Sequence, residues 1–320
     1  MLAVVDNNQK LFNSKWPIVE AIMYQASTKN LALAISEAGG FPSLCAAPVG
    51  TASSIDFDPM YFELCDFIKA NGSANVVVPL SVEWLSQKNF LKIVKDFKIS
   101  HWEIFPRDTN TNTQRCLSEV LMDNLIYHGV KFLQRYSCVM GRLFNPVKNH
   151  PRLSILDAVT IKGSDGGGAT GIGIHTVQET FNQQINYSKN VIPYGGIGSP
   201  HQVKNYLQQG APAVGVGTLF AMCVESPLTH DVKLQMLNKS STDIINIKGS
   251  TNGSLRQNAI LLNSNIKTDG TDNKGNHTDD LTAGIHGNGT QGLIFAGHGI
   301  DYVTKIRTVR ETIEYLTSEL

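Results

Sequence analysis

The sequence lacks several features that would each assign it to a particular class of protein. Its five cysteines are odd in number and widely spaced, and they include no C-x-x-C pair. This argues against a disulfide framework or a zinc site, and for free thiols in a reducing compartment. No apolar run reaches the roughly 18 residues that a membrane-spanning helix needs. The N-terminus has no basic start followed by a long apolar run, so no secretory signal is expected.

The sequence also has no excess of positive or negative charge. The chain carries 27 basic and 27 acidic residues and has a pI of about 7.1. A balanced charge without blocks of one sign gives no indication of a nucleic-acid partner. We therefore expect a cytoplasmic protein that binds neither nucleic acid nor membrane. Its 320 residues suit one barrel with an appended lid.

The most informative stretch runs from Val191 to Phe220. It begins with a short apolar run that ends at a glycine pair, which predicts a strand and a turn. Ser199 then provides an N-cap with Pro200 at the first helical position, and Gly210 ends the predicted helix. A second buried strand follows and ends at another glycine. The stretch therefore predicts two consecutive βα units.

Both predicted strands open into bare backbone, at Gly195-Gly196 and at Gly217-Thr218. Without Cβ atoms the backbone can approach an anion closely, and its N–H groups can hold a phosphate. The loops after strands seven and eight of a (β/α)8 barrel often build such a site. Two ordinary βα turns are the alternative interpretation. The spacing of the two glycine turns by one unit favours phosphate binding.

Strands and helices alternate along the chain every 25–30 residues or so, as is typical of a parallel sheet with both faces covered. More than six repeats favour a closed (β/α)8 barrel over an open sheet. No G-x-G-x-x-G follows the first strand, which weakens a dinucleotide-binding alternative. The strands that we predict are residues 18–23, 76–80, 101–105, 130–133, 158–161, 191–194 and 213–216, and the helices include 61–69, 90–97, 116–127 and 223–237.

Four motifs in order resemble the flavin-dependent nitronate monooxygenase family, formerly called 2-nitropropane dioxygenase, which includes flavin-containing enoyl-acyl-carrier-protein reductases. They are Ala21-Ile22-Met23 with the later Gly39-Gly40, the loop Gly163–Gly171, the turns GGI and GT described above, and Ala296-Gly297 before the last helix. The resemblance implies an α/β fold, namely a (β/α)8 TIM barrel with a small C-terminal lid insertion. It also implies FMN as the cofactor.

The resemblance assigns flavin contacts to particular residues. The backbone around Ala21 and Met23 would lie against the flavin ring, and Gly167 and Gly168 match the glycine pair of the family's G-x-E-A-G-G-H-x-G loop. The histidine of that loop is Ala169 in this chain. In the family this histidine acts as the base or orients the substrate, and an alanine methyl can do neither.

Lys162, His175 and Asp165 are the candidates to replace that histidine. Lys162 lies at the end of a predicted barrel strand, where it could stabilise an anionic reduced flavin. A lysine that reaches solvent or pairs with Asp165 is the alternative. His175 could equally be an ordinary residue at a helix start. His298, beside the C-terminal glycines, is a further active-site candidate, and a surface histidine is its alternative.

Composition changes at residue 238, and residues 238–292 are rich in Asn, Ser, Thr and Gly, as expected of a long segment that is functional or partly flexible. The resemblance implies that residues 1–237 form the FMN-binding barrel and that residues 238–292 form a lid that shapes substrate access. Residues 293–320 return as a strand and a helix that pack on the barrel.

The reaction is left open between three hypotheses. The first is a nitronate monooxygenase-like oxidoreductase, in which substrate reduces FMN and oxygen reoxidises it. The second is reduction of an enoyl thioester or quinone with NAD(P)H as electron donor. The third is a barrel that binds FMN or phosphate and has lost the family chemistry. The expected partners are a small-molecule or acyl-thioester substrate and, in a homodimer, a second copy of the chain. No metal is expected.

Overall fold

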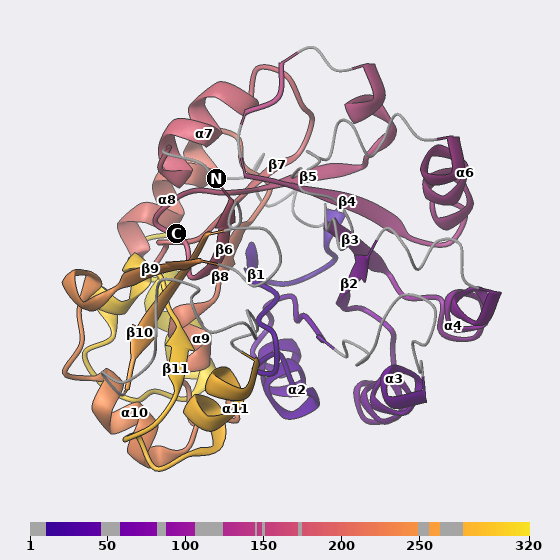
Figure 1. The fold of residues 1–320 in the computed structure, drawn as a ribbon. Coiled ribbons are helices and arrows are strands. Elements are labelled where there is room, and N and C mark those ends of the chain that lie inside the picture. Colours follow the sequence, from indigo (N-terminus) through magenta and orange to yellow (C-terminus); the bar gives the residue numbers. More distant parts are fainter. Residues whose placement is uncertain are drawn as a thin grey trace.

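The barrel sheet is the largest element of the fold (Figure 1). The computed structural model describes residues 11–45, 58–81, 88–105, 124–144, 146–148, 151–171, 175–248, 256–262 and 278–320. Seven parallel strands lie in the order β1-β8-β7-β5-β4-β3-β2. They are β1 (Ile18–Glu20), β2 (Val77–Ser81), β3 (His101–Phe105), β4 (Cys138–Leu143), β5 (Ala158–Lys162), β7 (Val191–Tyr194) and β8 (Val214–Val216).

A short extended segment, residues 41–43, closes this sheet into a barrel. Phe41 bridges to Val19 of β1, and Ser43 bridges to Val77 of β2, both in parallel. The backbone bonds agree, since Glu20 N–H donates to the Phe41 carbonyl and Leu44 N–H donates to the Val77 carbonyl. The segment thus occupies the place of the second strand. The expected (β/α)8 barrel is confirmed.

Helices cover the outside of the barrel, and one cluster of buried apolar residues lies between them and the strands (Figure 1). A second, smaller cluster fills the barrel interior. The main helices are α2 (Lys29–Glu37), α3 (Asp58–Asn71), α4 (Lys88–Phe97), α6 (Asn124–Leu133), α7 (Val177–Gln184), α8 (Pro200–Gln208) and α12 (Val309–Leu316). The shorter ones are α9 (Thr218–Ala221), α10 (His230–Met236) and α11 (Thr278–His286).

Helix α8 follows its predicted signals closely. The Ser199 side chain accepts from Gln202 N–H and the Gln202 side chain bonds back to Ser199, which forms a capping box with Pro200 at the first position. Helix α7 begins in the same way at Thr176. These caps fix where each helix starts after its strand and therefore shape the turns between them.

Three predicted elements were wrong. Residues 130–133 belong to helix α6, and the strand that follows is β4, because Val130 and Leu133 fall on one helical face and are both buried. Residues 223–237 form no continuous helix, since only α10 lies there. Strand β1 ends at Glu20, so Ala21–Met23 lie beyond it. Residues 116–123 of the expected fourth helix lie outside the described residues.

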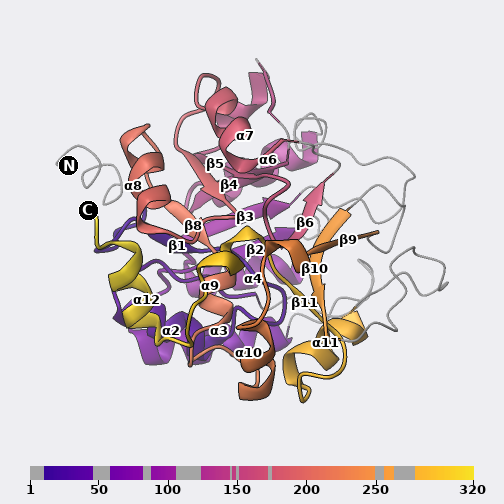
Figure 2. The same cartoon turned by 90° about the vertical axis from the view of Figure 1, so that its left-hand side faces the viewer.

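A second, antiparallel sheet lies beside the barrel, on the side away from α12 (Figure 2). Its central strand β10 (Arg256–Leu261) pairs with β9 (Ile245–Lys248), with β6 (Gly168–Gly171) and with β11 (Leu293–Phe295). The expected lid segment thus contributes two strands and α11, while the flanking parts of the chain supply β6 and β11. The division at 237 and 292 stays a prediction.

Within the described ranges, no helix has both the length and the hydrophobicity to cross a bilayer. The four cysteines that these ranges contain form no disulfide with one another.

Candidate active site

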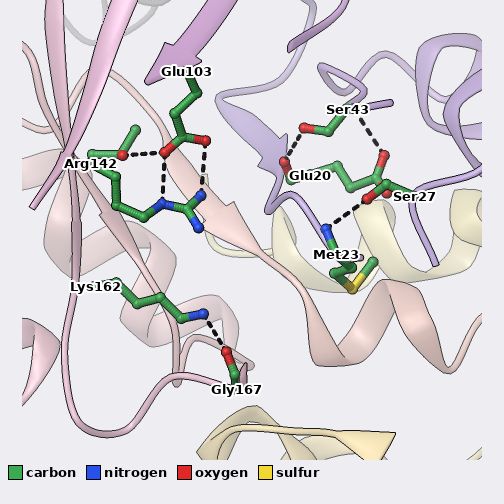
Figure 3. A network of polar contacts seen from close by, with 9 residues as sticks. Glu20, Met23, Ser27, Ser43, Glu103, Arg142, Lys162 and Gly167 are labelled. Atoms are coloured by element: carbon green, nitrogen blue, oxygen red, sulfur yellow. Dashed lines mark hydrogen bonds and ion pairs between the residues drawn. The ribbon is translucent and has the colours of Figure 1, made fainter. Parts of the chain in front are cut away.

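The site is built where the barrel strands end, and Lys162 is its most informative residue. Lys162 is the last residue of β5, where Thr160 and Lys162 alternate with the outward-packed Val159 and Ile161. Its Nζ donates a hydrogen bond to the Gly167 carbonyl (Figure 3). Burial and, to a smaller extent, the nearby Arg142 cation lower the pKa of Lys162 to about 7, against a smaller opposing effect of Glu103.

Beside Lys162 lies an ion pair that the sequence did not indicate. Arg142 of β4 donates from Nε and Nη2 to the two carboxylate oxygens of Glu103 of β3, both at 2.8 Å. The Thr160 hydroxyl donates to the same carboxylate, and both charged side chains are buried. The Arg142 guanidinium also stacks over the rings of Phe105, 4.2 Å away, and Tyr194. A glutamate and an arginine inside otherwise apolar strands are the signal that could have revealed this pair.

The loop after β5 is held from three directions. The Asp165 carboxylate accepts from Val177 N–H at the start of α7, and its carbonyl accepts from His298 N–H. The Asn258 amide of β10 donates to the carbonyls of Ser164 and Gly166. Burial raises the pKa of Asp165, and the Val177 N–H opposes this. Asn258 is a further residue that sequence reasoning missed, because its contact depends on the second sheet.

The first predicted glycine turn packs tightly against this loop. Gly195 has φ +98°, and a Cβ there would lie 2.6 Å from the Gly166 Cα. Gly196 has φ +69°, and its Cβ would lie 2.8 Å from an Asp165 carboxylate oxygen. The backbone conformation and the close packing therefore both require glycine at these two positions.

The second predicted turn is open by comparison. Gly217 has φ −114°, which any residue adopts. A Cβ there would meet only Ala21 Cβ at 3.5 Å and the Met23 side chain at 3.6 Å, which are ordinary contacts. The structure thus brings Ala21, Met23 and Gly217 together, and their contacts to a flavin stay a prediction. Thr218 Oγ1 accepts from Gly297 N–H at 3.1 Å.

Gly297 joins the two halves of the site. Its backbone nitrogen bonds Thr218, and it also lies against Gly167, whose Cβ would come within 2.8 Å of that nitrogen. The neighbouring Gly168 has φ +65° and faces the Phe295 ring. Gly297, which follows β11 of the second sheet, therefore contacts both the loop after β5 and the residue that begins α9 after β8.

A lone acid lies at the end of β1. Glu20 is fully buried and accepts from Ser43 N–H at 2.9 Å, while its Oε1 has no hydrogen-bond partner among the residues that the structure describes. Ser27, which hydrogen-bonds the carboxyl, also accepts from Met23 N–H (Figure 3). Burial raises the pKa of Glu20 to about 8, against the opposing Ser43 and Ser27 bonds. The group is therefore a neutral acid at pH 7.

The remaining catalytic candidates occupy less central positions. His175 is 39% exposed, and its Nδ1 lies 4.0 Å from the exposed carboxylate of Glu179 on α7. His298 is exposed, although its backbone bonds Asp165. Ala169 lies in β6 opposite Gln257 of β10. Of the candidates, Lys162 alone has its side-chain nitrogen bonded to the glycine loop in the residues described.

The fold and this site define a (β/α)8 barrel with glycine-rich turns at the carboxyl ends of its strands. A family model described as "Nitronate monooxygenase" matches residues 142–319, more than half of the chain. The chain belongs to the nitronate monooxygenase family, and it is an oxidoreductase of this family of flavoproteins. No curated protein sequence matches it.

Solved structures show the same fold at low sequence identity. FabK from Thermotoga maritima is 18% identical with a TM-score of 0.70, over 97% of this chain and 94% of that one. A nitroalkane oxidase from Streptomyces ansochromogenes is 18% identical with a TM-score of 0.70, over 98% and 97%. An enoyl reductase domain of MlnA from Bacillus amyloliquefaciens is more distant, at 11% and 0.53, over 79% and 65%.

Proposed function

We propose that this chain is an FMN-dependent oxidoreductase resembling nitronate monooxygenase, in which substrate reduces the flavin and oxygen reoxidises it. The observation that carries this proposal is Gly217, a glycine that neither its own conformation nor its neighbours require. A side chain there would fill space beside Ala21 and Met23, at the mouth of the barrel. Bare backbone kept at such a place suits the close approach of a cofactor.

The residues at the mouth of the barrel have the chemistry that FMN needs, with bare backbone for its phosphate and small or apolar residues for its ring. Gly217 and Thr218 would hold the phosphate, together with the bare backbone of Gly195 and Gly196 that follows β7. Ala21 and Met23 would lie against the ring. FMN, when bound, would accept electrons from the substrate and pass them to oxygen.

The protein groups around it have separate tasks. Lys162 and the Gly167-Gly168 backbone would face the ring from the β5 side, with the Lys162 cation favouring negative charge there. Asn258 and Val177 hold the loop that carries these glycines. Ala169 holds no proton, so proton transfer falls to Lys162 or to substrate chemistry that needs no protein base. His175 and His298 remain secondary candidates.

A second function is reduction of an enoyl thioester or quinone with NAD(P)H as donor. The likeness in fold to FabK and to an enoyl reductase domain supports it. The third hypothesis is a barrel that binds FMN or phosphate and has lost the family chemistry, and the alanine at position 169 favours it.

Anaerobic spectra of the purified protein separate these functions. We expect a yellow protein whose flavin bleaches when a nitronate is added and recovers when oxygen is admitted. Bleaching by NAD(P)H, but not by a nitronate, would select the reductase. A protein that neither carries FMN as purified nor binds it when added would overturn the proposal. Gel filtration of the same sample would test the expected homodimer.

A further inference from the structure

The charges around Lys162 are unequally compensated. The Arg142 cation is balanced by two hydrogen bonds from its guanidinium to the Glu103 carboxylate, at 2.8 Å each. Lys162 has no such partner, because in the described part of the chain its Nζ bonds a carbonyl, that of Gly167, and forms no ion pair. The β3–β5 side of the mouth therefore holds one cation without a counter-charge (Figure 3).

We propose that Lys162 binds a planar oxyanion on the substrate, such as the group of a nitronate, and takes up a proton when that anion arrives. This inference rests on the proposed function, since it assigns the substrate class of the same site. The anion supplies the negative charge that no carboxylate in the described part of the chain provides to Lys162. The neutral enoyl thioester of the reductase alternative would supply none.

The proton uptake follows from the surroundings of the amine. Burial and Arg142 bring the pKa of Lys162 to about 7, so roughly half of the molecules hold a neutral amine at pH 7. A neighbouring anion favours the ammonium form and raises that pKa. By linkage, the anion then binds more tightly at low pH, and its dissociation constant rises by up to about tenfold per unit above pH 7.

Other titrating groups in the neighbourhood are already engaged or neutral. Glu103 of β3 is bonded to Arg142 of β4 and to Thr160. Tyr194 of β7 is a neutral phenol, because burial raises its pKa well above the ordinary value. Asp165 of the loop bonds Val177 and interacts with His298, so these two groups form a separate pair. Glu20 of β1 also titrates within the range of the test, because burial raises its pKa to about 8. Lys162 is thus the basic group expected to change charge near pH 7, and its variants separate its proton from that of Glu20.

The test uses nitrate as an unreactive planar oxyanion, titrated into the flavin-loaded protein between about pH 6 and pH 9. Calorimetry in two buffers of different ionisation enthalpy measures the protons taken up. We expect proton uptake when nitrate binds at pH 7 and weaker binding as pH rises. If the wild-type protein binds nitrate without proton uptake and with an affinity that does not change over this pH range, the inference is overturned, whatever the variants show.

Two variants sharpen this result. Lys162→Arg keeps the charge at every pH, so nitrate should bind without proton uptake, whereas Lys162→Met should bind it at least tenfold more weakly at pH 6. Lys204→Met removes a partly exposed lysine that lies near Glu319, and it should behave like the wild type. Nitrate binding to Lys162→Met as tight as to the wild type would also sink the idea.

Failure here is distinguishable from failure of the proposed function. The nitrate titration can be repeated on protein stripped of flavin, so it does not depend on turnover. A protein whose flavin is reduced by a nitronate but whose nitrate binding is independent of pH would keep the function and lose the inference. A protein that binds no flavin yet couples nitrate to proton uptake would do the reverse.

Discussion

The two glycine turns at the ends of β7 and β8 look alike in sequence and differ in structure. At Gly195, a positive φ and a backbone neighbour 2.6 Å from a would-be Cβ make glycine a requirement of the fold. At Gly217, φ is ordinary and the nearest neighbour would lie at 3.5 Å. The first glycine is explained by the protein's own packing. The second is not, which is why it points to a ligand.

The same contrast holds for the polar groups on the two sides of the mouth (Figure 3). On the β3–β5 side, Glu103 and Arg142 pair with one another, and Lys162 forms no ion pair with any residue in the described ranges. On the β1 side, one carboxyl oxygen of Glu20 has no hydrogen-bond partner in the same ranges, and the group stays protonated at pH 7. A group with an unused charge or hydrogen-bonding atom, Lys162 or Glu20, therefore lies on each of the two sides of the mouth where we propose that the flavin makes contact.

The largest effect is expected from Gly217→Glu. The ordinary φ lets the variant fold, but its carboxylate would stand beside the phosphate. Two charges about 4 Å apart repel by roughly 4 kcal/mol near a protein surface, which corresponds to about a thousandfold loss of affinity. We expect protein that purifies with the wild-type circular dichroism spectrum and without FMN. Unchanged flavin content would refute the assignment of the phosphate site.

Gly217→Gln and Gly217→Ala separate charge from bulk in this experiment. The glutamine has the size of glutamate without the charge and should retain part of the flavin. The alanine meets only ordinary contacts at 3.5 Å, so the stability of the flavin-free protein should stay within about 0.5 kcal/mol of the wild type.

Gly195→Ala should instead destabilise the protein itself. A left-handed backbone costs alanine about 1–2 kcal/mol, and the clash with Gly166 adds about 1–3 kcal/mol. Urea unfolding of the flavin-free protein measures the sum. Gly72→Ala is the matched control, because Gly72 has φ +72° with no atom within 4 Å, and it isolates the backbone cost. Equal losses at both positions would mean that the β7 turn yields to the extra methyl group.

The sequence predicted the parts of this fold that depend on local pattern. The boundaries of β3 and β7 and the capped start of α8 were correct, since alternation, capping residues and glycine stops lie within a few residues of one another. Residues 130–133 were misassigned as a strand because a short apolar run fits both the helical and the strand periodicity, and these residues form the end of helix α6. The second strand of the barrel was missed because residues 41–43 form only two bridges.

The candidate site divides in the same way. Lys162, Gly195 and Gly217 could be found because each ends a recognisable strand. The Arg142–Glu103 pair was missed, although a glutamate and an arginine in otherwise apolar strands indicate it, because only the register of the neighbouring strands β3 and β4 brings the two side chains together. The contact of Asn258 with the glycine loop could not be predicted from the sequence. Asn258 reaches the glycine loop from a strand 92 residues later, and only the second sheet brings the two together.

The smallest effect is expected from Glu20→Gln, which tests the β1 side of the comparison. In the folded protein Glu20 keeps its proton up to about pH 8, whereas the unfolded carboxyl ionises from pH 4.5. The folded state therefore binds more protons in this window, and stability falls as pH rises from 4.5 to 8. A glutamine keeps the shape and carries no such dependence.

The difference in melting temperature, variant minus wild type, should therefore grow between about pH 5 and pH 8, to roughly 1–2 °C for a net gain of about 1 kcal/mol in a chain of 320 residues. Asp165 and Glu63, whose pKa values are also raised by burial, are common to both proteins and cancel in the difference. A difference that stays flat over this range would show that Glu20 ionises at its ordinary pH. In that case the contrast between a neutral β1 side and a charged β5 side would have to be abandoned.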